Sequence, residues 1–329
     1  METLIEVRAL RKVYRVSQRT QAGLWPAIKG FVRRQHTEVV AVDGVDLSID
    51  SGEIRALIGP NGAGKSTIIK VLTGILHPTG GEVRCLGVTP WSDRTAYVRR
   101  IGAVFGQKTQ LLWDLPAVDT FALNQRIYRI PRDRYRRNLE YFVDTFGLAG
   151  ILTKPVRNLS LGERMKCELA AALLHEPSLV FLDEPTIGLD ILAKQAVREF
   201  VKRVNAERDT TFLLTTHDLD DVAELCRRIT VINQGTVVFD STVDELHTDY
   251  AAGKVLELRL TGPVEGDVMR RWNAVAHSPT VWTVQLDGEG DGPTAVAEIL
   301  GTLPVQDIEV KSLPIETVIR HLYASPEHR

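Results

Sequence analysis

A glycine-rich run is the first feature of this chain that could carry out chemistry. Its nine residues fit the pattern G-x-x-x-x-G-K-[ST] and read Gly59, Pro60, Asn61, Gly62, Ala63, Gly64, Lys65, Ser66 and Thr67. The glycines let backbone N–H groups wrap around phosphates, and the N-terminus of a following helix adds positive potential. In such a loop Lys65 reaches the β- and γ-phosphates, and the Ser66 hydroxyl faces Mg²⁺. The run therefore predicts a site for a nucleotide with its magnesium ion.

Two carboxylates at the end of an apolar segment narrow the chemistry. The segment LVFL (179–182) is followed directly by Asp183 and Glu184. Asp183 is suited to holding the shell of Mg²⁺, and Glu184 to polarising the water that attacks a phosphate. An acidic pair after a strand is also a common start of a loop, and a phosphate loop alone does not choose among a kinase, a GTPase and a transport ATPase. Taken together, the two motifs favour nucleotide hydrolysis.

The elements that must position these residues alternate between strands and helices. Apolar runs predict buried strands at IRALI (54–58), IGAVF (101–105), SLVFL (178–182), TTFLLTT (210–216) and RITVI (228–232). Alternating apolar residues at 45–49 and a segment near 81 predict further strands, and residues 65–76 predict a helix. This order predicts an α/β fold with a largely parallel sheet.

A helical region, about 108–176, interrupts the strand pattern. Pro131 fits a first helical position, and Gly147 fits a helix C-cap. Ser160 and Glu163 form the S-x-x-E pattern of a capping box. We therefore expect a helical subdomain inserted into the α/β core.

The pattern changes near residue 245 and restarts at 254. Strands are expected at 255–260, 280–286 and 305–310, and helices near 265–275, 293–302 and 314–323. The chain is therefore expected to contain a first domain, 1–245, and a small βαβαβα domain, 254–329. Residues 254–329 carry seven Lys and Arg against eleven Asp and Glu, so this module is a poor candidate for nucleic acid.

Composition excludes several classes of protein. The 329 residues carry 40 Lys and Arg against 42 Asp and Glu, a formal net charge of −2, which argues against a non-specific nucleic-acid binder. No apolar run approaches the length of a membrane-spanning helix, and charges flank the short N-terminal apolar stretches, so neither a span nor a signal peptide is expected. The three cysteines, Cys85, Cys167 and Cys226, are too far apart for a metal knuckle. The expected location is the cytoplasm.

Further motifs resemble those of one family, the nucleotide-binding subunits of ABC transporters. Residues 159–163 (Leu-Ser-Leu-Gly-Glu) resemble the LSGGQ signature of that family. By the same resemblance Gln107 matches the Q-loop, Asp190 the D-loop and His217 the switch histidine, while Tyr14 matches the aromatic residue that stacks on adenine. The resemblance covers roughly residues 4–245. It implies a P-loop NTPase core of the ABC type with a helical subdomain, followed by the small C-terminal α+β domain.

The resemblance also implies ligands and residue roles. ATP and Mg²⁺ are the expected ligands, with Ser66, Gln107 and Asp183 around the metal. Glu184, His217 and Gln107 are the expected catalytic residues. Besides the phosphate loop, the expected nucleotide contacts are Tyr14, Ser160, Gly162, Glu163 and Asp190. Tyr14 could instead be a half-buried strand residue, and Ser160 is expected to cap its helix as well.

The signature departs from the family pattern at Leu161, which replaces a glycine. Leucine rarely adopts the positive φ values open to glycine, whereas the Gly162 backbone remains free to approach phosphate. In this family the signature of one subunit covers the ATP held by another. The resemblance therefore implies a dimer with a second copy or with a paralogous subunit.

A basic insertion follows Tyr14. Residues 8–36 contain eight Lys and Arg and no Asp or Glu. On a helical wheel of 24–34, the apolar side chains fall within an arc of roughly 120°, outside which Lys29, Arg33 and Arg34 lie; they are Leu24, Trp25, Ile28, Phe31 and Val32. Such an element suits a membrane surface or a membrane partner, and a basic loop on the protein's own surface is the alternative. Residues 17–38 are therefore expected to form a basic amphipathic insertion.

Three functions compete at this stage. The motif set resembles ATPase subunits of ABC-2 type exporters, which work with a separately encoded permease at the inner face of the cell membrane. A soluble ABC ATPase on a scaffold or the ribosome, and an importer subunit, are the alternatives. Trp113 and Leu115 are expected either to contact the permease or to be buried in the subdomain. Export is the favoured function, and the substrate is not readable from the chain.

Overall fold

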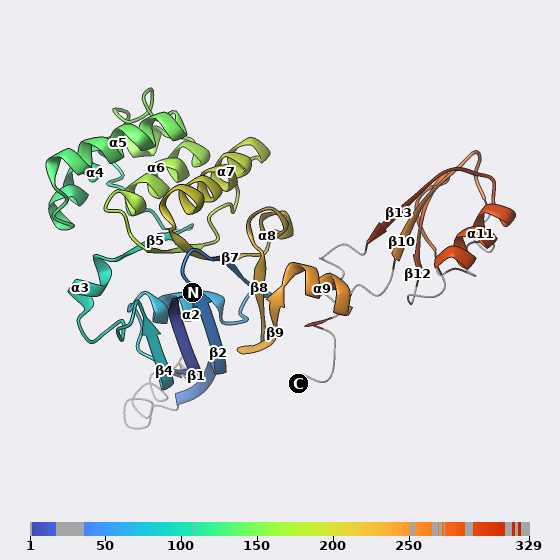
Figure 1. Ribbon diagram of the computed structural model, residues 1–329, viewed down its shortest axis with the longest axis horizontal. Coiled ribbons are helices and arrows are strands. Elements are labelled where there is room, and N and C mark those ends of the chain that lie inside the picture. Colours follow the sequence, from blue (N-terminus) through green and yellow to red (C-terminus); the bar gives the residue numbers. More distant parts are fainter. Residues whose placement is uncertain are drawn as a thin grey trace, which may run out of the picture. The chain divides into compact units, whose positions relative to one another are not determined.

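The computed structural model of the chain describes residues 2–17, 36–106, 108–250, 254–264, 274–286 and 292–312, together with residues 269, 272, 318, 319, 322 and 323. The chain divides into two compact units, Met1–Asp240 and Ser241–Arg329 (Figure 1). The expected first domain, 1–245, runs five residues past this division. The separate roles of the two domains stay predictions.

A six-stranded sheet forms the centre of the first unit. Its strand order is β5 (Ile101–Phe105), β6 (Leu179–Asp183), β7 (Thr211–Thr216), β3 (Ile54–Ile58), β8 (Arg228–Asn233) and β9 (Thr236–Thr242). The ladders from β5 to β8 are all parallel. Every residue of β7 is buried, as expected of a central strand covered on both faces. The predicted α/β fold with a largely parallel sheet is confirmed.

Strand β9 was not predicted. It follows β8 after two residues, Gln234 and Gly235, which both have positive φ values, 47° and 85°. Two such residues make the tight turn of a β-hairpin, so β9 extends the edge of the sheet beside β8. The glycine at position 235 is the sequence signal for this turn.

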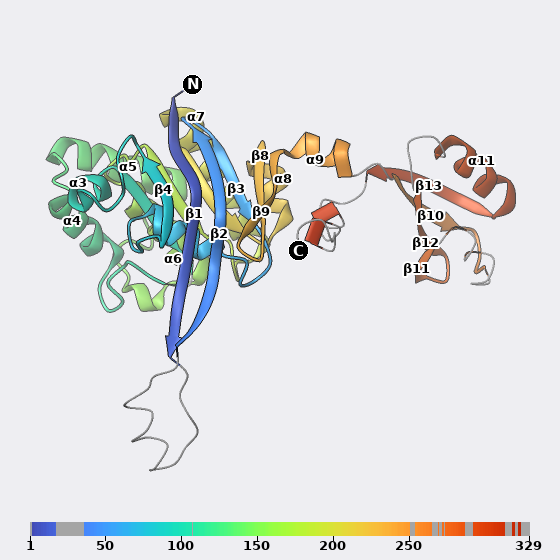
Figure 2. The same cartoon turned by 90° about the horizontal axis from the view of Figure 1, so that it is seen from below.

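A second, three-stranded sheet has the order β2 (His36–Asp50), β1 (Thr3–Ser17) and β4 (Gly80–Cys85), with antiparallel pairing. Residues 45–49 were expected as a short strand, but β2 is three times as long. Its pairing with β1 runs from Thr3 opposite Asp50 to Ser17 opposite His36, side by side along the whole length (Figure 2). The expected amphipathic insertion lies outside the described residues, except for its ends at Ser17 and 36–38.

One buried cluster joins the two sheets through helix α2 (Lys65–Leu72). It combines Leu10 of β1 and Ile49 of β2 with Ile69 of α2 and Phe181 of β6, none of them more than 1% exposed. Helix α2 was expected to continue to residue 76. It ends at Leu72 because Gly74 adopts a φ of 71°, which terminates the helix.

Helices between β5 and β6 form the predicted helical region (Figure 1). They are α4 (Ala117–Ile127), α5 (Arg132–Phe146), the 3₁₀ turn Val156–Asn158 and α6 (Leu161–Leu173); a short α3 (Arg94–Val98) precedes β5. Gly147 caps α5 with a φ of 66°, as predicted. Pro131 occupies the N-cap of α5 and not its first helical position, so that prediction was wrong by one residue.

The second unit has its own antiparallel sheet and core. Helix α9 (Val243–Tyr250) precedes a sheet of order β11 (Val275–Ser278), β12 (Val281–Leu286), β10 (Lys254–Leu260) and β13 (Val305–Ser312). Helix α11 (Gly292–Thr302) contributes Ile299 to a buried cluster with Leu256 and Trp282. The three predicted strands and the helix 293–302 are confirmed. Strand β11 was missed, and Val275, expected to end a helix, belongs to it; the rest of that helix and the helix 314–323 lie mostly outside the described residues.

A buried histidine connects the helical region to the sheet. His175 follows α6, and its Nε2 donates a hydrogen bond to the carbonyl of Ile101 at 2.9 Å. Its ring stacks on Tyr128 with centroids 3.9 Å apart. Nδ1 is buried with no hydrogen-bond partner among the described residues. Burial lowers the pKa of His175 to about 4, although the hydrogen bond to Ile101 acts in the opposite direction.

Acidification is therefore expected to destabilise the protein through His175. The folded state keeps the imidazole neutral, whereas the unfolded chain takes up a proton below about pH 6.5. The free energy of unfolding therefore has its full His175 contribution above about pH 6.5. It falls by about 3 kcal/mol as the pH approaches 4, because the unfolded chain is then stabilised by protonation of His175. Urea unfolding of the wild type and His175→Gln across this window measures it. Equal losses of stability in the two proteins would contradict the assignment.

Candidate active site

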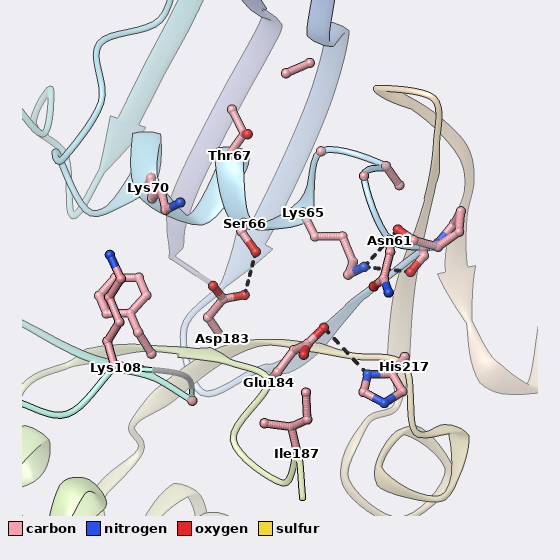
Figure 3. Close-up of a pocket in the computed structure, with 18 of the residues that line it drawn as sticks. Asn61, Lys65, Ser66, Thr67, Lys70, Lys108, Asp183, Glu184, Ile187 and His217 are labelled. Carbon is pink, nitrogen blue, oxygen red and sulfur yellow. Dashed lines mark hydrogen bonds and ion pairs between the residues drawn. The ribbon is translucent and has the colours of Figure 1, made fainter.

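A cavity of about 790 Å³ lies at the carboxyl ends of the central strands (Figure 3). The whole phosphate loop lines it, together with Asp183, Glu184 and His217. The other lining residues are Ala41, Lys70, Ile75, Phe105, Gly106, Lys108 and Ile187. The structure therefore brings together the phosphate loop, the acidic pair and the expected switch histidine, His217.

The backbone of the phosphate loop requires its glycines. Gly62 and Gly64 have φ values of 83° and 110°, which side chains other than hydrogen rarely tolerate. A Cβ at Gly64 would lie 2.5 Å from the carbonyl oxygen of Ala41. Gly64 is also the N-cap of α2, so the helix begins at Lys65 and directs its N-terminus to the cavity. The loop has the geometry of an anion site.

Lys65 lies inside the loop with a relative exposure of 6%. Its Nζ donates hydrogen bonds to the carbonyls of Gly59 at 2.7 Å and Pro60 at 3.1 Å. Burial lowers the pKa of Lys65 below its usual value, while the carboxylates of Glu184 and Asp183 act in the opposite direction. A cation held by carbonyls close to the helix N-terminus can reach a phosphate by rotation of its side chain.

Asp183 joins the loop to two strands. As the last residue of β6, it accepts hydrogen bonds at Oδ1 from the Ser66 hydroxyl at 3.1 Å and the Thr215 hydroxyl at 2.7 Å. A hydroxyl and a carboxylate placed side by side are hard oxygen donors, and they suit a Mg²⁺ ion that takes its remaining ligands from phosphate and water. The residues present therefore fit the expected metal.

Glu184 faces His217 across the cavity. Glu184 Oε1 lies 3.6 Å from His217 Nδ1 (Figure 3). The backbone of Glu184 has a φ of 55°, a conformation that residues other than glycine seldom adopt and that recurs at functional sites. Its N–H donates to the hydroxyl and the carbonyl of Thr215, at 3.0 and 3.1 Å, which holds the residue in this conformation.

The remaining predicted site residues are placed differently. Gln107 lies outside the described residues. Tyr14 does not line the cavity, but its hydroxyl is 3.5 Å from the Thr67 hydroxyl. Ser160 and Asp190 cap helices α6 and α7 (Ile191–Arg208), and neither lines the cavity. Within one chain, the signature and D-loop residues therefore do not meet the phosphate loop.

The signature forms the predicted capping box. The Ser160 hydroxyl accepts from the N–H of Glu163 at 3.2 Å, and the Glu163 carboxylate accepts from the N–H of Ser160 at 2.8 Å. The hydrogen bond from the Ser160 backbone lowers the pKa of Glu163. Leu161 is the first helical residue and has no positive φ, so leucine replaces glycine here without backbone strain.

The sequence analysis missed Thr215 and two lysines. Thr215 holds both Asp183 and the backbone of Glu184, and its signal was the polar end of a strand whose preceding residues are apolar. Lys70 and Lys108 line the cavity, and no salt bridge of either is among those found in the described part of the chain. Lys70 lies one turn beyond Ser66 on α2, a spacing that could have indicated it.

Comparisons with known proteins agree with this geometry. A family profile described as ABC transporter matches residues 42–187. The daunorubicin/doxorubicin resistance ATP-binding protein DrrA of Streptomyces peucetius is 32% identical over 295 residues, which cover 87% of this chain and 88% of that protein. The ABC transporter ATP-binding protein NatA of Bacillus subtilis is 31% identical over 209 residues, covering 64% of this chain and 85% of that protein.

A solved structure described as an ATP-binding subunit of an ABC transporter has a TM-score of 0.62 at 27% identity, covering 75% of this chain and 93% of its own. The fold, the cavity and these relatives define one class of protein. The chain belongs to the ABC transporter family, as an ATP-binding subunit. It is an ABC ATPase, in which ATP hydrolysis is coupled to transport.

Gly106 connects strand β5 to the acidic pair. Its N–H donates to the carbonyl of Asp183 at 2.8 Å, and a Cβ at Gly106 would lie 2.3 Å from the carbonyl oxygen of Glu184. Gly106→Ala is therefore expected to displace the backbone of Glu184.

We expect Gly106→Ala to lower ATP hydrolysis about tenfold or more and to destabilise the fold by about 1–3 kcal/mol. Steady-state ATPase assays and urea unfolding measure the two effects. Gly150→Ala is the matched control, because a Cβ there meets no atom within 4 Å. The steric argument fails if the two variants behave alike.

Proposed function

We propose that this chain powers export of a substrate through a separately encoded ABC-2 type permease. The observation that carries the proposal is the extent of the likeness to the drug-resistance subunit. That likeness covers 87% of the chain, more than the 240 residues of the first unit, so it continues into Ser241–Arg329. Shared sequence in this second unit supports a shared mode of action and not only a shared ATPase core.

In this proposal the cavity residues divide the work of hydrolysis. Lys65 and the N–H groups of the phosphate loop bind the β- and γ-phosphates. Glu184 orients the attacking water and accepts its proton, and His217, 3.6 Å from Glu184, contacts the γ-phosphate. Gln107 is proposed to contact the metal and the attacking water, and Tyr14 to stack on adenine.

Mg²⁺ is the proposed cofactor, held by Ser66, Asp183 and Gln107. When bound, it would neutralise the charge that develops on the phosphate oxygens. The Ser66 and Asp183 oxygens are already hydrogen-bonded to each other, which supports a prearranged pair of ligands.

A second copy, or a paralogous subunit, is proposed to complete the site. Ser160, Gly162, Glu163 and Asp190 lie away from the cavity of their own chain, which supports a role toward the nucleotide of a partner. Ile191 and Leu192, directly after Asp190, are 84% and 78% exposed. Apolar side chains with this exposure next to the D-loop suit a protein–protein contact.

Permease contact is proposed for the helical region. Trp113 and Leu115 are 48% and 45% exposed, which favours the permease over internal packing. None of the helices in the described ranges combines the length and apolarity that a bilayer crossing needs. Residues 17–38 are proposed to contact the permease or the inner membrane surface, and the second unit to influence dimer contacts or permease pairing.

Identification of the partner tests this function. The tagged full-length chain, purified from detergent-solubilised membranes of its own host, is expected to retain a multi-pass membrane protein in a fixed ratio. Inside-out vesicles that contain the complex should accumulate an exported substrate on addition of ATP, with daunorubicin as the first probe. Retention of a ribosome or a soluble scaffold would favour a soluble ABC ATPase. ATP-driven movement of substrate in the opposite direction would favour an importer subunit.

Glu184→Gln tests the proposed base. The variant keeps the size of the side chain but cannot accept a proton, so ATP hydrolysis should fall by about 10²- to 10⁴-fold while ATP binding is retained. Lys65→Ala is the comparison variant and should weaken binding as well. Wild-type turnover in purified Glu184→Gln protein would remove Glu184 from this role.

Replacement of residues 17–38 by a short Gly/Ser linker tests the insertion. Near an anionic leaflet each Lys or Arg contributes about 1 kcal/mol, and residues 19–34 hold four, so membrane attraction of at most about 4 kcal/mol should disappear. Nucleotide binding should stay near normal, while transport by the complex falls. Liposome flotation at low and high salt measures the attraction, which salt screens in the wild type. Unchanged flotation together with unchanged transport would reject a role for the segment.

A further inference from the structure

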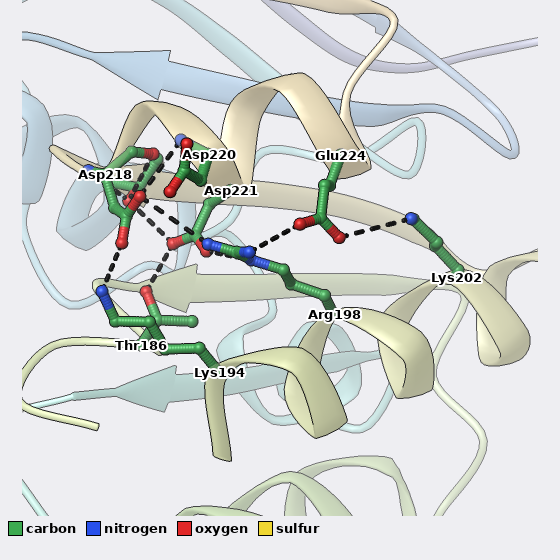
Figure 4. A network of polar contacts seen from close by, with 9 residues as sticks. Thr186, Lys194, Arg198, Lys202, Asp218, Asp220, Asp221 and Glu224 are labelled. Atoms are coloured by element: carbon green, nitrogen blue, oxygen red, sulfur yellow. Dashed lines mark hydrogen bonds and ion pairs between the residues drawn. The ribbon is translucent and has the colours of Figure 1, made fainter. Parts of the chain in front are cut away.

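A buried carboxylate joins the two loops that carry Glu184 and His217. Asp221, on helix α8 (Leu219–Leu225), has no exposed surface. Its Oδ2 accepts a hydrogen bond from the Thr186 hydroxyl at 2.5 Å (Figure 4). The same oxygen accepts a second hydrogen bond from the Thr216 hydroxyl at 3.1 Å. Thr186 stands two residues after Glu184, and Thr216 directly precedes His217. One carboxylate oxygen thus links the two segments.

Arg198 balances the charge of Asp221. It lies on α7 with a relative exposure of 7%, and its Nε donates to Asp221 Oδ1 at 2.6 Å. A second donor of the same guanidinium reaches Glu224 at 2.7 Å. Burial opposes the charge of Arg198, but the hydrogen bond and charge of Asp221 raise its pKa. The Arg198 guanidinium therefore stays charged, and because it binds Oδ1, the other oxygen of Asp221 is left to accept from the two threonines.

The backbone on both sides of His217 is held by the same contacts. The Thr216 hydroxyl accepts a hydrogen bond from the N–H of Asp218 at 2.9 Å while it donates to Asp221. The Asp218 carboxylate caps α8 through the N–H of Asp220 at 3.1 Å and pairs with Lys194 of α7 (Figure 4). His217 itself is largely exposed and rests on this turn, so its position relative to Glu184 depends on residues that do not touch the cavity.

We propose that Thr186, Asp221 and Arg198 are positioning residues for ATP hydrolysis, which set the separation of His217 from Glu184. The inference rests on the roles proposed above for these two residues. Thr186 fixes the segment after Glu184, Asp221 connects that segment to the turn of His217, and Arg198 ties both to the helix that begins after Asp190. None of the three lines the cavity, so each acts through another residue.

Thr186→Val tests the link with the smallest change, because it removes one hydroxyl and keeps the branched shape of the side chain. We expect kcat for ATP hydrolysis to fall about 5- to 20-fold, since small misplacements of catalytic groups have effects of this size, with KM for ATP changed less than about twofold. Thr186→Ser restores the hydroxyl and should restore kcat. If Thr186→Val does not fold, Thr186→Ala carries the same test.

Thr230→Val is the matched control. Thr230 on β8 also donates to a carboxylate, Asp240 at 2.9 Å, and that carboxylate likewise pairs with a buried arginine, Arg55. Among the hydrogen bonds found in the described residues, none joins Thr230 to the loops of Glu184 or His217. A similar loss of melting temperature with an unchanged kcat is expected in this variant. A fall in kcat equal to that of Thr186→Val would show that the effect is one of general stability.

A double-mutant cycle with His217→Ala separates positioning from structure. If Thr186 acts through His217, Thr186→Val should lower the residual kcat of His217→Ala by less than about twofold. The same 5- to 20-fold loss in both backgrounds would overturn the inference while leaving the role of His217 intact. Wild-type kcat in His217→Ala alone would instead refute the proposed role of His217.

Discussion

The hydrogen bonds that converge on the Asp183 carboxylate are the interaction on which the site depends. Asp183 ends β6 and receives Ser66 from the start of α2 and Thr215 from the end of β7. These three residues come from distant parts of the chain: Asp183 is the last residue of β6, Ser66 the second residue of α2 and Thr215 the penultimate residue of β7. A displacement of the sheet relative to α2 would therefore separate the phosphate loop from both carboxylates.

Sheet topology explains why the polar residues meet at one edge. Strands β5, β6, β7 and β3 are neighbours and run parallel, so their carboxyl ends lie at the same side of the sheet. Gly106, Asp183, His217 and Gly59 each follow or end one of these strands. Open parallel sheets place their ligands at this edge, because the loops there connect to helix N-termini. The cavity therefore depends on the order of the strands in the sheet as well as on the residues of the motifs.

Local sequence signals predicted the features whose conformation depends on neighbouring residues in the chain. The glycines of the phosphate loop, the capping box of Ser160 and Glu163, and the C-cap at Gly147 each depend on neighbours in the chain, and all three form as expected. Strands β1 and β11 and the full length of β2 were missed, because pairing with a partner strand decides where such strands form and how far they extend. The predicted helix 65–76 is four residues longer than α2, because the apolar periodicity continues past the point where Gly74 ends the helix.

The sequence by itself indicated the chemistry of this protein. Residue type and spacing predicted a phosphate loop and a pair of carboxylates after a strand, and the resemblance to ABC subunits added the histidine. Short-range geometry translates the first two motifs directly into local structure. Only the tertiary structure decided that Asp183 contacts Ser66 and Thr215, that Ser160 lies away from its own cavity, and that Asp221 joins two loops. Contacts of this kind depend on which strands are neighbours and on which groups are buried together. The spacing of residues along the sequence determines neither.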